Sequence, residues 1–271
     1  MLRVRSASGE ELCSVAREQV GVCLDLKRHL RSLHGFPLCL QQLLRQGRCL
    51  EDGDPVHGEP DEIQLVLLEV ISEAQRGEAG KELVLAAMSG LREAVRLLLQ
   101  AGVEKNCCCK DGAGGKATAI LSAVQAGHTE IVRLLVEAGA DQDMRDHHGR
   151  TALILAAASG QTEIVRLLVE AGADKDLRDS FARTALIAAA YKGPTEILRL
   201  LVDAGVDSDP QDSFGRTALM VAASCGQAGF VHLLLEAGAK TDSIDNFGRT
   251  AFAHAHDAGH AETVSLLQHV S

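Results

Sequence analysis

The feature that most constrains the fold is a 33-residue period in the C-terminal two-thirds of the chain. Three columns of identical residues keep this step in phase: Thr118, Thr151, Thr184, Thr217 and Thr250; Gly127, Gly160, Gly193, Gly226 and Gly259; and Gly139, Gly172, Gly205 and Gly238. Self-similarity at such a period is typical of proteins in which each repeat contacts only its neighbours. The sequence therefore predicts an extended stack of similar units.

One copy, residues 151–183, predicts two helices and a projecting loop. Thr151 is placed to cap a short helix that Gly160 ends. Apolar residues at helical spacing over 162–171 predict a second, amphipathic helix. The polar segment 174–183 is too short for a third helix and predicts a hairpin-like finger. Each second helix buries only about three or four large aliphatic side chains, so a repeat is stable only when it is stacked.

This pattern resembles the ankyrin repeat, which has the same period, helix pair and finger. The resemblance covers residues 81–271 as six ankyrin-type repeats, an all-α solenoid whose last repeat is truncated and capping. The family's Thr-Pro-Leu-His reads Thr-Ala-Leu-Ile at Thr151 and Thr184, and loss of the proline and histidine predicts a looser array. A four-residue insertion in the first finger lengthens the step from Gly102 to Gly139 to 37 residues.

Three positions depart from the repeat pattern. Gly229 stands where other repeats have glutamate, in the interior of an expected helix, and predicts that repeat five is weakest by roughly 1 kcal/mol. Thr263 and Gln268 replace apolar residues of their columns, as expected when no further repeat covers them. We therefore expect a complete array that opens first near Gly229.

Residues 1–70 show no repeat and predict a small α+β domain. Alternating apolar residues predict a starting hairpin, and later strands fall within 40–48 and 63–70. Between them, a helix is expected to begin at Asp25, to end at Gly35 and to pack through one face. That face consists of Leu26, Leu30 and Leu33. The order ββαββ predicts one helix packed on a mixed sheet.

This region resembles ubiquitin and the ubiquitin-like (β-grasp) domains. The residues that carry the likeness are Leu26-Lys27, Leu30, Gly35-Phe36-Pro37, Gln41-Gln42-Leu43-Leu44, Gly47-Arg48, Leu50-Glu51-Asp52-Gly53 and Ile63-Gln64-Leu65-Val66-Leu67. The resemblance implies an apolar partner-binding patch at Ala7, Leu44 and Val66, weakened because alanine is small. Arg48 stands at the family's chain-linkage lysine, and no Gly-Gly follows Val70, so no handle for conjugation is expected. Residues 71–80 read as a short flexible linker.

Composition argues against several classes of function. The formal net charge of −10 repels phosphate backbones, so nucleic acid is not expected as a partner. No stretch approaches the roughly 18 to 20 apolar residues that cross a bilayer, and the start of the chain lacks a secretory signal. The eight cysteines fit a reducing compartment. We expect a monomeric cytoplasmic protein, with access to the nucleus left open and without insertion into a membrane.

The clusters that could carry chemistry match known sites poorly. Cys107–Cys109 are adjacent, whereas zinc ligands are spaced so that two thiolates can turn towards one ion. The glycine-rich run 112–116 lacks the pattern of a phosphate loop. His254 and His256 do not share a helical face, and His260 follows the expected end of the helix. We therefore expect no catalytic residue, no metal and no cofactor, and only a catalytic metal in the Cys-rich finger would make the chain an enzyme.

The fingers and the turns beside them are the candidate partner-binding surface. Its residues are His147, His148, Arg150, Phe181, Arg183, Tyr191, Lys192, Phe214, Arg216, Phe247 and Arg249. Aromatic and arginine side chains there are expected to receive an acidic or mixed segment of another protein. A structural alternative is that aspartates four residues earlier pair with the arginines and hold the fingers: Asp146, Asp179, Asp212 and Asp245.

The sequence therefore predicts a protein-binding adaptor or scaffold that catalyses nothing. A more specific alternative is a substrate receptor that links cargo to the ubiquitin–proteasome machinery through its ubiquitin-like domain. A third reading is a fragment-like relative of longer multidomain chains that needs a partner for stability.

Overall fold

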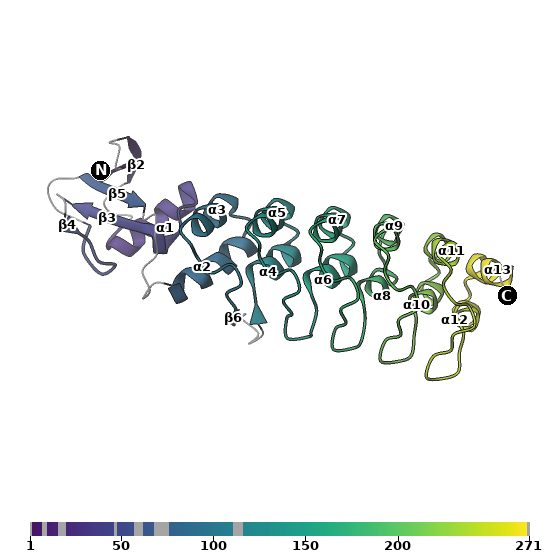
Figure 1. Ribbon diagram of the computed structural model, residues 1–271. Helices are drawn as coiled ribbons and strands as arrows, with labels where there is room; N and C mark the ends of the chain where they lie inside the picture. The colour runs from purple at the N-terminus through teal and green to yellow at the C-terminus, as the bar shows by residue number, and fades with distance from the viewer. Residues whose placement is uncertain are drawn as a thin grey trace. The chain divides into compact units, whose positions relative to one another are not determined.

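The computed structural model describes residues 2–6, 10–15, 20–45, 48–56, 62–67, 76–110 and 116–269 (Figure 1). The chain divides into two compact units, here called the N-terminal unit, Met1–Cys107, and the C-terminal unit, Cys108–Ser271. No helix in the described ranges is long and apolar enough to cross a membrane.

The N-terminal unit contains a five-stranded mixed sheet with the order β2-β1-β5-β3-β4. Strand β1 (Leu2–Ser6) pairs antiparallel with β2 (Glu11–Val15) and parallel with β5 (Glu62–Leu67). On its other side β5 pairs antiparallel with β3 (Gln41–Arg45), which pairs with the short β4 (Arg48–Cys49). The starting hairpin and the mixed sheet agree with the sequence, and β4 is an additional strand.

Helix α1 (Cys23–His34) packs on this sheet. Leu26 and Leu30 are fully buried with the inward residues of the strands, and Gly35 ends the helix with a φ of 71°. Leu33, expected on the same face, is instead 54% exposed. It lies near the end of the helix and at the edge of a buried stripe that is centred on Cys23, Leu26 and Leu30.

Helices α2 (Arg76–Met88) and α3 (Arg92–Gln100) complete the N-terminal unit. Part of the segment expected as a flexible linker is helical, because α2 begins at Arg76; residues 71–75 lie outside the described part of the chain. Two glycines make the start of α2 a poor helix by propensity. Ala79 and Gly80 are nevertheless buried there, so tertiary packing stabilises this turn.

The C-terminal unit consists of five helix pairs joined by fingers (Figure 1). The first helices are α4 (Ala119–Ala126), α6 (Ala152–Ala158), α8 (Ala185–Ala189), α10 (Ala218–Ser224) and α12 (Ala251–Asp257). The second helices are α5 (Thr129–Glu137), α7 (Thr162–Glu170), α9 (Thr195–Asp203), α11 (Ala228–Glu236) and α13 (Ala261–Gln268). First helices pack on first helices and second on second. With α2 and α3, the described residues form six helix pairs, numbered below as repeats 1 to 6.

The threonine column caps the first helices, as the sequence predicts. Thr151 Oγ1 accepts a hydrogen bond from the backbone N–H of Ile154 at 3.4 Å, and every threonine of the column makes the same bond. The first helices are rich in buried alanine, such as Ala156 and Ala157, which allows close approach. Gly172 follows the end of α7 with a φ of 84°.

Two expectations about single positions are wrong. Gly229 is the second residue of α11, so it lies in the first turn, where backbone N–H groups lack helical partners, and not in the helix interior. Thr263 is buried, only 1% exposed, because its column faces the inside of each helix pair, as Ile164 and Ile197 show. Gln268 is exposed, as expected for the last helix.

Candidate partner-binding surface

Each of four fingers in the C-terminal unit is held by a buried aspartate. Asp179 Oδ1 accepts the backbone N–H groups of Phe181 and Arg183, at 2.8 and 2.9 Å. Its Oδ2 accepts Nε and Nη2 of Arg183, at 2.8 and 2.7 Å. The same arrangement recurs in the pairs Asp146–Arg150, Asp212–Arg216 and Asp245–Arg249. The pairing expected under the structural alternative is therefore present.

The aspartates at the two ends of this row have lowered pKa values. Burial alone would raise the pKa of Asp245, but the backbone N–H groups of Arg249 and Phe247 and the side chain of His254 hold it at about 2. His254 Nε2 lies 2.9 Å from Asp245 Oδ2. Burial likewise opposes the hydrogen bonds of Arg150 at Asp146, and the bonds prevail and lower that pKa. Both carboxylates are ionised at neutral pH, so the ion pairs Asp146–Arg150 and Asp245–Arg249 are present there.

The finger tips are hydrogen-bonded to one another through the backbone. The bonds run from Ser180 N to His148 O, from Ser213 N to Phe181 O and from Asn246 N to Phe214 O, at 2.9, 2.9 and 3.0 Å. Side chains strengthen the row, since Arg145 donates to Arg178 O in the next finger. The tips therefore form one connected edge, here called the finger edge, and the fingers project on the same side of the helix pairs (Figure 1).

Aromatic rings are exposed along this edge. The exposed fractions are 49% for Phe181, 46% for Phe214 and 70% for Phe247. In each finger the guanidinium of the arginine two residues later lies over the phenylalanine ring, and the distances to the ring centre are 5.1, 4.9 and 5.3 Å in the same order. In repeat 2, the exposed His148 stands at the position of these phenylalanines, and its ring centre lies 3.8 Å from that of the preceding, exposed His147. The edge thus combines exposed rings with guanidinium groups that are already paired.

Of the predicted surface residues, the structure brings Tyr191 and Arg216 together. Tyr191 Oη accepts a hydrogen bond from Arg216 Nη2 at 2.7 Å, and Lys192 beside it is exposed. Burial would lower the pKa of Arg216, but its hydrogen bonds and charge interactions with Asp212 and Tyr191 raise it. Phe214 lies on the same finger as Arg216, and the remaining predicted residues lie on the other fingers of this edge.

In the N-terminal unit, two of the three predicted patch residues lie on the outward face of the sheet. Leu44 pairs with Gln64, and Val66 pairs with Gln42, which makes Leu44 and Val66 diagonal neighbours. Both are half-buried. Ala7 lies outside the described residues.

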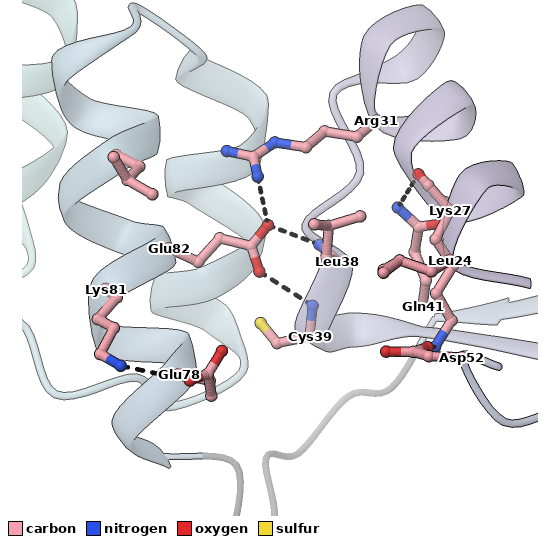
Figure 2. Close-up of a pocket in the computed structure, with 11 residues that line it drawn as sticks. Leu24, Lys27, Arg31, Leu38, Cys39, Gln41, Asp52, Glu78, Lys81 and Glu82 are labelled. Carbon is pink, nitrogen blue, oxygen red and sulfur yellow. Dashed lines mark hydrogen bonds and ion pairs between the residues drawn. The ribbon is translucent and has the colours of Figure 1, made fainter.

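Sequence reasoning missed Glu82, which joins α2 to the sheet-bearing part of the N-terminal unit (Figure 2). The residue is only 7% exposed. Its carboxylate accepts the backbone N–H groups of Leu38 and Cys39, at 2.6 and 2.9 Å, and pairs with Arg31 at 3.2 Å. Leu38 and Cys39 begin η2 (Leu38–Leu40), a short 3₁₀ helix. A glutamate in a helical segment ordinarily indicates a solvated face, so the sequence carried no signal of this role.

A cavity of about 380 Å³ lies beside Glu82 between α1, η2 and α2 (Figure 2). Its three cations are all paired, in the pairs Lys27–Asp52, Lys81–Glu78 and Arg31–Glu82 at 2.6, 3.3 and 3.2 Å. Burial, together with the charge of Glu82, raises the pKa of the Cys39 thiol far above its usual range. Among the described residues that line it, the cavity therefore presents neither an unpaired charge nor a reactive thiolate.

The candidate chemical clusters are engaged in structural contacts. Within the described residues, no three His, Cys, Asp or Glu side chains converge as a metal site would require. His254 binds Asp245, and His260 Nε2 lies 3.1 Å from Ser224 O. The Cys107 thiol lies 3.2 Å from Gly80 O. In the first finger, β6 (Cys109–Lys110) pairs with β7 (Lys116–Ala117), and the residues between them are outside the described part.

Comparison with known proteins identifies the family. A family model for ankyrin repeats, in three copies, matches residues 83–179 and 171–245. The crystal structure of an ankyrin repeat domain from Acinetobacter baumannii AYE is 31% identical, with a TM-score of 0.63, and the match covers 69% of this chain and 96% of that one. Among curated proteins, no significant match is found. The repeat period, the capped helix pairs, the finger geometry and these matches together show that the chain belongs to the ankyrin-repeat family.

Proposed function

We propose that this protein is an adaptor or scaffold that binds a partner protein through the finger edge of its C-terminal unit. Ankyrin repeats imply a role in protein–protein interaction and are typically not enzymes. The observation that carries the proposal is the row of exposed rings, Phe181, Phe214 and Phe247, on connected finger tips. Aromatic and arginine side chains dominate the energetic centres of protein interfaces.

The ion pairs within the fingers support this proposal and do not compete with it. Because each arginine is paired with a buried aspartate, its side chain is held in place before a partner arrives. A preorganised side chain loses little conformational entropy on binding. The same contacts that stabilise the fingers therefore also prepare them for binding.

Affinity capture with the full chain tests this function. Proteins retained from an extract of the expressing cells should be lost when Phe181→Ser and Phe214→Ser are combined. The matched control combines Arg199→Ser and His232→Ser, two exposed positions on the second helices α9 and α11. Retention by the finger variant, or equal loss in the control, would remove the finger edge as the binding surface.

We also propose, as a more specific alternative, that the N-terminal domain is ubiquitin-like and connects cargo to the ubiquitin–proteasome machinery. The helix packed on a mixed five-stranded sheet supports this assignment. The outward, half-exposed Leu44 and Val66 support a binding patch on that sheet. The fingers would then select the cargo.

The alternative is tested by titrating the full chain with a purified ubiquitin-binding domain of a proteasomal receptor. Binding should weaken in Leu44→Ser, since that change removes an apolar side chain from the patch. Leu33→Ser is the matched control, because Leu33 is equally apolar and more exposed but lies on α1. Absence of binding at millimolar concentration would rule this alternative out and leave the adaptor function untouched.

A further inference from the structure

The turn between the helices of repeat 4 differs from those of the neighbouring repeats. Its first helix, α8, has five residues, whereas α6 and α10 have seven. Gly193 precedes Pro194, and a residue before proline is driven towards extended backbone. Accordingly, Gly193 lacks the positive φ that Gly160 and Gly226 adopt in the same column. The turn over residues 190–194 is therefore rearranged.

This turn places Tyr191 against the finger of its own repeat. Arg216 donates a hydrogen bond to the Tyr191 hydroxyl through Nη2. Its guanidinium carbon lies 5.9 Å from the centre of the Tyr191 ring and 4.9 Å from the centre of the Phe214 ring. The same column holds Ala158 in repeat 3 and Ser224 in repeat 5, whose side chains are too short to reach a finger. Repeat 4 thus combines an aromatic ring from a turn, an aromatic ring from a finger and a guanidinium.

The cluster has hydrogen-bond donors and positive charge that its own contacts do not use. Arg216 directs Nε and Nη2 to Asp212 and Tyr191, and no acceptor for Nη1 is found among the described residues. Because Tyr191 Oη accepts from Arg216, its own proton is available to another acceptor. Lys192 is exposed and forms no ion pair within the described part of the chain. Asp212 balances Arg216, so Lys192 leaves the cluster locally positive on a chain of formal net charge −10.

We propose that this cluster is the anchor site for one carboxylate of the partner, formed by Tyr191, Lys192, Phe214 and Arg216. The inference rests on the proposed binding role of the finger edge. A carboxylate pairs strongly with the ammonium and guanidinium groups and accepts from the tyrosine hydroxyl. Apolar side chains on either side of that carboxylate would cover the rings of Phe214 and, one finger earlier, Phe181. The occupant is therefore an apolar protein segment that carries one aspartate or glutamate.

A phage-displayed library of random linear peptides, selected on the full chain, tests this proposal. The expected result is enrichment of peptides in which an acidic residue is flanked by apolar or aromatic residues. Exchange of that acid for its amide in a synthetic peptide should weaken binding about tenfold, because a charged hydrogen-bonded pair is lost. The effect should shrink at high salt.

Variants of the protein locate the carboxylate. Tyr191→Phe keeps the ring and removes only the hydroxyl, and Lys192→Gln removes only the charge. Each should weaken binding of the acidic peptide severalfold, by about three- to tenfold, and should leave the amide peptide almost unaffected. Arg199→Gln is the control, since it removes one exposed positive charge from the same repeat but on α9.

The outcomes separate this inference from the proposed function. Selected peptides that lack an acidic residue, or that bind Tyr191→Phe and Lys192→Gln as tightly as the original chain, overturn the anchor site. If such peptides still lose binding in Phe181→Ser and Phe247→Ser, the finger edge remains the binding surface. If no peptide is enriched, or if none responds to the finger variants, the proposed function fails as well.

Discussion

The N-terminal unit and the fingers of the C-terminal unit contain the same kind of buried carboxylate contact, but the contact joins residues at very different separations in the sequence. In both, a buried carboxylate accepts two backbone N–H groups and pairs with an arginine. The N–H partners of Glu82 lie 44 and 43 residues away, whereas those of Asp179 lie two and four residues away. The finger motif also occurs four times, while Glu82 has no counterpart among the described residues.

This difference in sequence separation predicts which substitutions should destabilise the molecule most. A local carboxylate orders a single turn, and its loss is confined to one finger. A long-range carboxylate joins segments that are far apart in the sequence. When it is lost, the long loop between these segments gains conformational entropy, which favours their separation. The largest effects should therefore come from the N-terminal unit.

Glu82→Ala should have the largest effect on stability. It leaves the N–H groups of Leu38 and Cys39 and the guanidinium of Arg31 without their acceptor, which should cost about 3 kcal/mol. Urea unfolding followed by circular dichroism, with hydrogen exchange over residues 23–45 and 76–100, measures the loss. Glu78→Ala removes an exposed carboxylate one turn earlier and should cost less than about 0.5 kcal/mol. Equal effects in the two variants would contradict a special role for Glu82.

Acid should weaken a finger through Asp245. Its folded pKa of about 2 lies below the value of about 3.9 for an unfolded chain, so its contribution is complete above roughly pH 4 and is lost as the pH falls towards 2. Asp245→Asn should lower stability by about 2 kcal/mol at neutral pH and flatten the decline between pH 4 and 2. Thermal unfolding across this range measures both effects. Asp242→Asn, an exposed change in the same finger, should alter neither.

Ala182→Gly should stabilise the finger of repeat 3 by about 1 kcal/mol. Ala182 has a φ of 57°, the single positive φ among described non-glycine residues, and its column holds Gly149, Gly215 and Gly248 in the fingers of repeats 2, 4 and 5. An L-residue in this conformation costs about 1–2 kcal/mol, part of which the greater entropy of glycine in the unfolded chain offsets. Chemical denaturation measures the gain. Gly149→Ala should do the reverse, because its Cβ would meet Ser180 N at 3.1 Å; stabilisation by that change would refute the argument.

Gly229→Glu should have the smallest effect, a gain below about 1 kcal/mol. In repeats 3 and 4 the glutamate at this position pairs with an arginine of the preceding second helix, Arg133–Glu163 and Arg166–Glu196, at 3.6 and 3.2 Å. The change would offer Arg199 the same partner and place an acid in the first turn of α11. Gly229→Ala separates helix propensity from charge, since only the charged variant should lose its gain in high salt. A gain that is equal and salt-independent in both would exclude the ion pair.

The parts of the fold that could be predicted are those whose partners are close in sequence. Thr151 caps its helix through the N–H group three residues later, and Asp179 pairs with an arginine four residues later, so spacing alone reveals both. The candidate surface was predictable for the same reason, because its rings recur with the repeat. The contact of Tyr191 with Arg216 was not, since it depends on a turn that Pro194 rearranges.

By itself, the sequence determined the repeat period, the helix pairs, their caps and the ion pairs of the fingers. Each of these follows from residues close in sequence, and the same spacing recurs in several repeats, which rules out coincidence. Only the tertiary structure decided that Glu82 is buried, that α2 extends through an expected linker and that Thr263 lies inside its helix pair. These outcomes depend on which distant segment packs against a residue. The sequence pattern around a helical residue is the same whether its side chain faces water or another segment of backbone, and only tertiary packing decides between the two.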